Sequence, residues 1–188
     1  MKSSPPSELM ERLVGETCSE LFTAYGVSLR RMPAATPLTE AWNDEASGGL
    51  VTFDSPSMTG SLVLVGTFRF LASCRPKEVR TRPLKRESSA DWILVRDWTT
   101  ELVNQLLGRV RNRLYARGVA LDWKNPVALS GHSLGMAMKP RPKATFEFAA
   151  ADGQIVRVWL DTRFNPTFAP APPKDAAAVP EEGDVLLF

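Results

Sequence analysis

The chain has 188 residues, a single histidine, two cysteines and a formal net charge of +2. This length suits one domain, or one domain with a tail, that buries a core without help from disulfides or metals. Cys18 and Cys74 lie far apart without a C-x-x-C partner, and His132 stands alone, so a zinc site or a redox pair is disfavoured. The small net charge gives no support for nucleic-acid binding.

The N-terminus, the apolar runs and the cysteines together indicate the cellular compartment. The first six residues are polar and carry no apolar signal, and apolar runs such as 62–65 are far too short to span a membrane. Two unpaired cysteines fit a reducing compartment. The sequence therefore predicts a cytoplasmic protein with no membrane contact.

The first half of the chain predicts one helix followed by a hairpin. Apolar residues recur at helical spacing over 7–25, and a short strand is expected at 27–32. A loop follows over 33–48. The segments 49–53 and 61–71 are rich in Val, Leu and Phe, and the turn signal at 54–60 predicts that they pair as a hairpin. Six basic residues and two prolines make 75–87 a basic loop. It lacks the interleaved aromatic residues of a nucleic-acid patch, so it is either simply solvated or attracts an acidic partner.

The second half predicts a long helix and three more strands. The helix spans 90–117, with Ser88 and Asp91 at the spacing of a capping box. Strands are expected at 126–130, 144–150 and 154–160, the last two joined by an Asp-Gly turn. The fold class is α/β of the α+β type. The expected organisation is a disordered N-terminus at 1–6, a domain at 7–162 and a flexible Pro/Ala-rich tail at 163–188.

A polar stripe follows one side of the long helix. At about 100° per residue, the side chains expected to be buried share one broad face: Val95, Trp98, Leu102, Leu106, Val110 and Leu114. The opposite face carries Asp97, Glu101, Asn104, Gly108 and Arg111. Glu101 and Asn104 lie about 60° and one turn apart, so they can reach the same object. Asparagine and glycine are poor helix formers, so the stripe is either an ordinary solvated face or a docking surface.

The stripe also carries a motif. Asp97-x-x-x-Glu101-x-x-Asn104, followed after twenty-one residues by Pro126, resembles the pattern of the CheC/CheX/FliY chemotaxis phosphatases, which hydrolyse the aspartyl phosphate of the response regulator CheY. The segment from Glu101 to Gly108 resembles the family's E-x-x-N-x-x-x-G. Only one copy of the motif is present, which is the CheX arrangement. The resemblance implies a CheC/CheX-like fold, with an extended antiparallel sheet and two long helices, and a possible homodimer.

The resemblance further implies a role for each residue of the stripe. Asn104 would position the attacking water and Glu101 would dock on the active-site lysine of the regulator, as the two catalytic residues. Asp97, Gly108 and Arg111 would contact the partner, a phosphorylated CheY-like regulator that brings its own Mg²⁺, so no cofactor or metal is expected in this chain and no nucleic acid among its partners. The alternative is a non-enzymatic CheX-like module that binds a signalling partner without hydrolysis.

A second motif points elsewhere. Residues 131–135 match G-x-S-x-G, the nucleophile elbow of α/β-hydrolases. The catalytic triad needs a histidine after the serine, and His132, the one histidine, lies within the motif itself. Pro140 and Pro142 also oppose the helix that should follow the elbow. The sequence therefore favours a glycine-rich turn over an esterase.

Overall fold

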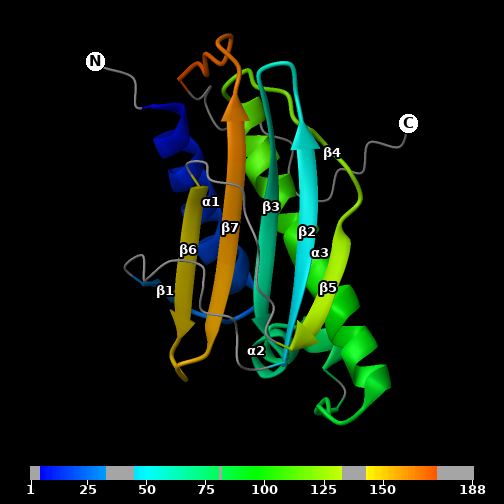
Figure 1. Cartoon of the computed structure of the whole chain (residues 1–188). Coiled ribbons are helices and arrows are strands. Elements are labelled where there is room, and N and C mark those ends of the chain that lie inside the picture. Colours follow the sequence, from blue (N-terminus) through cyan, green and yellow to red (C-terminus); the bar gives the residue numbers. More distant parts are fainter. Residues whose placement is uncertain (1–4, 33–44, 81, 133–142, 173–188) are drawn as a thin grey trace.

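The chain forms a helix-covered antiparallel sheet in this computed structural model, which describes residues 5–32, 45–80, 82–132 and 143–172. Seven strands of the described residues join in one sheet, in the order β1-β6-β7-β3-β2-β4, with β5 also pairing β2. All pairings are antiparallel (Figure 1). The strands are β1 (Leu29–Arg31), β2 (Glu45–Asp54), β3 (Met58–Thr67), β4 (Asp122–Trp123), β5 (Val127–His132), β6 (Lys143–Ala150) and β7 (Ile155–Phe164).

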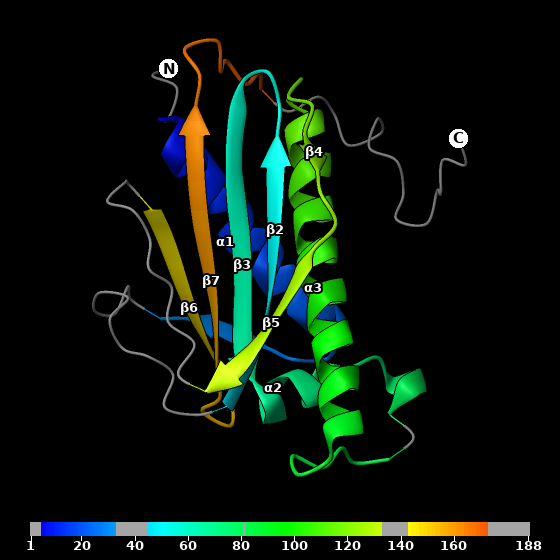
Figure 2. The same cartoon turned by 45° about the vertical axis from the view of Figure 1, so that its right-hand side comes forward.

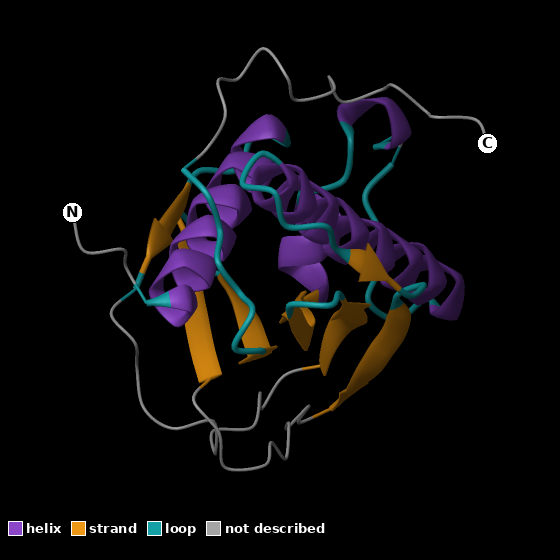
Figure 3. Ribbon diagram, turned by 90° about the horizontal axis from the view of Figure 1, so that it is seen from above, coloured by secondary structure: helices purple, strands orange, loops and turns teal. Residues whose placement is uncertain are grey.

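Two long helices, α1 (Pro6–Ala24) and α3 (Ser89–Tyr115), cover one face of the sheet (Figures 1 and 3). A short helix, α2 (Phe68–Ser73), and a 3₁₀ turn, η1 (Lys77–Val79), precede α3. The two helices are joined at their surfaces by Arg113 of α3, which pairs with Glu16 and Glu20 of α1. The expected fold class, an extended antiparallel sheet with two long helices, is confirmed.

The main core lies between the helices and the sheet. Because successive side chains of a strand point to opposite faces, Leu62 and Leu64 of β3 face this core, whereas Val63 and Val65 join a smaller buried cluster on the other face. Trp159 of β7 belongs to that second cluster. Strand β3 is thus apolar on both faces over its run from Leu62 to Val65.

Helix α3 lies against β2 with almost no space between them. A Cβ atom added to Gly49 would lie 2.7 Å from Cγ1 of Val103 and 3.2 Å from the carbonyl oxygen of Thr99. Both of those residues belong to α3. The glycine is therefore required by the approach of the helix, and this contact fixes the distance of α3 from the sheet. Figure 2 shows the helix running alongside β2 and β5.

Several expected boundaries differ from those observed, and strand β4 was not expected. Strand β2 begins at Glu45, four residues before the expected start at Gly49. Residues 68–71, expected to continue a strand, form α2, because the Thr67 hydroxyl accepts the Phe70 N–H and starts a helix there. The expected tail also begins with packed structure, because β7 continues to Phe164 and Phe168 is buried in the core.

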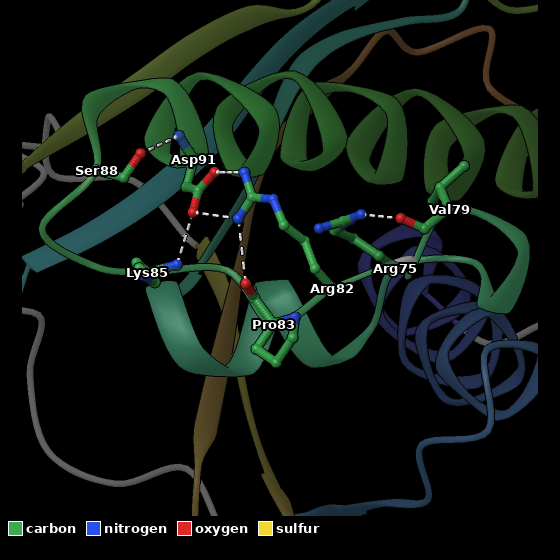
Figure 4. A network of polar contacts seen from close by, with 7 residues as sticks. All are labelled: Arg75, Val79, Arg82, Pro83, Lys85, Ser88 and Asp91. Carbon is green, nitrogen blue, oxygen red and sulfur yellow. Dashed lines mark hydrogen bonds and ion pairs between the residues drawn. The ribbon is translucent and has the colours of Figure 1, made fainter.

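The start of α3 is built differently from a capping box. The Ser88 hydroxyl accepts the Asp91 N–H, as expected. The Asp91 carboxylate, however, accepts hydrogen bonds from the Arg82 guanidinium and the Lys85 N–H rather than from Ser88 (Figure 4). Arg82 and then the Lys85 N–H lower the pKa of the Asp91 carboxyl to about 2. The buried carboxylate thus fastens the basic loop to the first turn of the helix.

The cysteines are free and buried, as expected for Cys18 on the inner face of α1. Burial raises the pKa of the Cys74 thiol to about 12 and raises that of Cys18 as well. None of the helices in the described part of the chain combines the length and apolar content that crossing a bilayer requires. Ser133 of the G-x-S-x-G motif lies outside the described residues.

Candidate functional site

The two faces of α3 are divided as the helical periodicity predicts. Asp97, Glu101 and Arg111 are exposed, and Asn104 and Gly108 are half-buried. On the inner face only Trp98 differs from the expectation, since it is half-buried at the margin of the core. The fully buried side chains of α3 are Asp91, Val95, Thr99, Leu102, Val103, Leu106, Leu107, Val110 and Leu114. The polar stripe is therefore an outward-facing surface of one rigid helix.

Glu101 is the end of a hydrogen-bonded chain that begins on α1. The Tyr25 hydroxyl, just after α1, donates to Oε1 of Gln105 at 2.6 Å. The Gln105 amide in turn donates to Oε1 of Glu101 at 2.7 Å. Tyr25 is itself placed by an edge-on contact with the Trp98 ring, at 5.0 Å between centroids. One carboxylate oxygen of Glu101 is thus held by a hydrogen bond. None of the described residues forms an ion pair with this carboxylate.

Asn104 is held from the opposite side by the sheet. The indole N–H of Trp123, in β4, donates to Oδ1 of Asn104 at 3.0 Å. The guanidinium of Arg111 lies over the same indole ring, 5.0 Å from its centroid. Asn104 and Arg111 are seven residues apart on α3, so a single tryptophan contacts two members of the stripe.

Gly108 leaves open space beside these residues. Apart from its chain neighbours and the nearby backbone of its own helix, a Cβ atom at this position would meet no heavy atom within 4 Å. Packing in this chain therefore does not require glycine here, although glycine in a helix interior costs about 1 kcal/mol against alanine. The structure explains Gly49 by contact and leaves Gly108 without an internal reason.

Asp97 stands apart from the other members of the stripe. Its side chain is 64% exposed and pairs with the neighbouring Arg96 at 3.3 Å. Two helical turns, about 10 Å along the axis, separate it from Asn104. The structure thus links Asn104 with Arg111 through Trp123, places Glu101 and Gly108 one turn to either side of Asn104, and pairs Asp97 with Arg96 instead.

Three residues of this surface were not expected from the sequence. Tyr25, Gln105 and Trp123 contact the stripe, but the first and last come from other elements, 79 and 19 positions from Asn104 by sequence number. Gln105 follows Asn104 directly and lies four residues after Glu101, which is the spacing of a helical side-chain pair. That spacing was the one signal available in the sequence.

A metal-binding cluster is not found in the part of the chain that the structure describes. Among these residues, no three His, Cys, Asp or Glu side chains are grouped so that they could hold an ion. The expectation that Mg²⁺ comes with the partner remains a prediction.

Comparison with known proteins defines the class: the chain has the CheC/CheX-like fold. A CheC-like superfamily protein from Shewanella sp. PV-4 is 18% identical with a TM-score of 0.66, covering 82% of this chain and 97% of its own. CheX from Vibrio vulnificus is 14% identical with a TM-score of 0.65, covering 87% and 100%.

The third similar structure contains a partner. It is the CheX–CheY–BeF₃–Mg²⁺ complex from Borrelia burgdorferi, in which the matching chain is 14% identical with a TM-score of 0.63 and covers 81% of this chain and 96% of its own. No sequence-family model matches the chain, and no curated protein matches it by sequence. At these identities the likeness is one of fold.

Proposed function

We propose that this chain is a chemotaxis phosphatase that hydrolyses the aspartyl phosphate of a CheY-like receiver domain. The observation that carries the proposal is the outer face of α3, where an asparagine and a carboxylate are fixed one turn apart beside an open glycine. The fold supports the chemotaxis role, and the complex of the Borrelia CheX with CheY supports a receiver domain as partner.

The reaction requires little from the protein beyond position. An aspartyl phosphate is a reactive acyl phosphate, and hydrolysis needs a water molecule in line with phosphorus. The water oxygen forms a bond to phosphorus while the bond from phosphorus to the carboxylate oxygen breaks. The products are inorganic phosphate, which carries the oxygen and both protons of the water, and the free carboxylate. Mg²⁺ of the receiver would neutralise charge on the phosphoryl oxygens.

Two residues of this chain position the water and the receiver. Asn104 holds the water through its amide, whose NH₂ donates a hydrogen bond while its oxygen accepts the Trp123 N–H. Glu101 forms an ion pair with the active-site lysine of the receiver, which sets the register of docking. Gly108 lets the receiver approach the helix surface beside them, and Asp97 and Arg111 contact its rim.

The test compares hydrolysis with binding. Receiver domains of the source organism are charged with acetyl phosphate, and loss of the phosphoryl group is followed with and without the protein. Binding is measured separately by titrating each receiver in its BeF₃–Mg²⁺ form. The proposal expects one receiver to bind and to lose its phosphate faster. If a receiver binds but keeps its phosphate at the unaided rate, the chain is a non-enzymatic module instead.

The variant Asn104→Ala separates the two activities further. It should slow hydrolysis by about 100-fold or more, because the water loses its fixed position, and should leave receiver binding close to wild type. Asn112→Ala is the matched control: the same substitution, on the same helix, eight residues further on. It should leave both activities unchanged. Equal hydrolysis by Asn104→Ala and the wild-type protein would overturn the proposal.

A further inference from the structure

The orientation of the Asn104 amide is decided by Trp123. An indole N–H can only donate a hydrogen bond, so the atom of Asn104 that faces Trp123 must be the carbonyl oxygen, Oδ1. The amide group is planar, and its NH₂ therefore lies on the branch away from the indole nitrogen. None of the described residues accepts a hydrogen bond from that NH₂, and the side chain is only half-buried.

Trp123 is itself fixed on several sides. Its backbone pairs with Phe53 at the end of β2. The following residue, Lys124, donates its N–H to the Thr52 carbonyl at 3.0 Å. One face of the indole ring is covered by the Arg111 guanidinium, and the ring packs against the main core. The donor is therefore anchored to the sheet and does not turn with the asparagine.

The choice of amide orientation has a chemical consequence. The terminal torsion of asparagine has broad, two-fold preferences, so an unrestrained amide presents either its oxygen or its NH₂. An outward oxygen would face the negatively charged phosphoryl group and repel it. An outward NH₂ instead donates to the oxygen of the attacking water, and the other lone pair of that oxygen remains free for phosphorus.

We propose that Trp123 is a positioning residue for the hydrolysis proposed above: its indole N–H holds the Asn104 amide with the NH₂ outward, toward the attacking water. The inference rests on the proposed function for its chemistry and on the hydrogen bond for its geometry. Arg111 acts with it by keeping the indole in place. The proposed function and this inference can be tested separately.

The first variant is Trp123→Phe, which removes the N–H and keeps an aromatic ring for the core and for Arg111. We expect kcat for receiver dephosphorylation to fall about tenfold, with KM for the charged receiver unchanged, because docking does not involve the indole nitrogen. Trp92→Phe is the matched control. It removes an indole N–H that donates to the Arg86 carbonyl at 2.8 Å, at the far end of α3, and should leave kcat unchanged.

The second measurement is a double-mutant cycle with Asn104→Ala. If Trp123 acts through Asn104, then Trp123→Phe should cause no further loss in the Asn104→Ala background. A wild-type kcat for Trp123→Phe would overturn the inference while leaving the proposed function in place. So would an equal loss in both backgrounds, which would indicate a merely structural role.

A third readout does not depend on hydrolysis. In the free protein, the indole proton of Trp123 should move upfield and exchange faster with water in Asn104→Ala than in the wild type, by NMR. An unchanged indole resonance would show that the hydrogen bond does not exist and would overturn the inference directly. If the bond is present but the wild-type protein hydrolyses no bound receiver, the proposed function fails, and the positioning role fails with it.

Discussion

On its inner face α3 is packed so closely that Gly49 of β2 has no room for a side chain, whereas on its outer face Gly108 has nothing within 4 Å of the place its side chain would occupy. The inner glycine is explained by the fold. The outer one lowers helix stability without a packing gain. The contrast indicates that contacts within this chain determine the inner face, whereas they leave the glycine of the outer face unexplained.

The largest change in the free energy of unfolding is expected when the close packing on the inner face of α3 is disturbed. Gly49→Ala should lower the free energy of unfolding by about 1–3 kcal/mol, because the new methyl group overlaps Val103 and crowds the Thr99 carbonyl. Urea denaturation measures this loss. A double-mutant cycle with Val103→Ala should show favourable coupling, since the smaller side chain makes room. Simple additivity would contradict the contact.

A smaller effect of opposite sign is expected on the outer side. Gly108→Ala should raise the free energy of unfolding by about 0.5–1 kcal/mol, because the methyl group meets no neighbour and the unfolded chain loses freedom. The same denaturation experiment serves as the check. Gly108→Arg, by contrast, should weaken binding of the BeF₃–Mg²⁺ receiver. A destabilised Gly108→Ala would mean that the outer face is packed after all.

The last effect depends on pH and is expected at the start of the helix. Asp91 has a pKa of about 2 in the folded protein, below the ordinary value of 3.8, so the unfolded chain takes up the proton first as the pH falls. The stability contributed by the ionised carboxylate is complete above pH 3.8 and is lost as the pH falls through about 2. Asp91→Asn should remove this part of the acid dependence, as measured by urea midpoints between pH 5 and pH 2.

Most of the fold could be predicted because it depends on local patterns. The period of α3 identified its buried face, and the alternating segments near the Asp-Gly turn identified β6 and β7. The errors fall where a local pattern is ambiguous. A short apolar run such as 68–71 suits either a strand or a helix, and the Thr67 cap decided the outcome.

The site could be predicted only in part, for a related reason. Glu101, Asn104 and Gly108 share one helix, so spacing alone places them together. Trp123 reaches Asn104 from β4, and Tyr25 reaches Gln105 from the end of α1. Contacts of this kind depend on how the helices lie on the sheet. Asp91 likewise appeared to be half of a capping box, whereas its carboxylate binds Arg82 of the preceding loop.

The close packing of α3 on β2 at Gly49 also affects the rate and the affinity with which a partner would associate. Helix and sheet are in backbone-level contact there, and Trp123 ties the outer face of α3 to that same sheet. The Asn104 side chain is held by that hydrogen bond before another protein arrives, so it loses little conformational entropy on docking. Association is then limited by the mutual orientation of two preformed surfaces. Its rate depends on long-range electrostatic attraction and therefore on salt concentration.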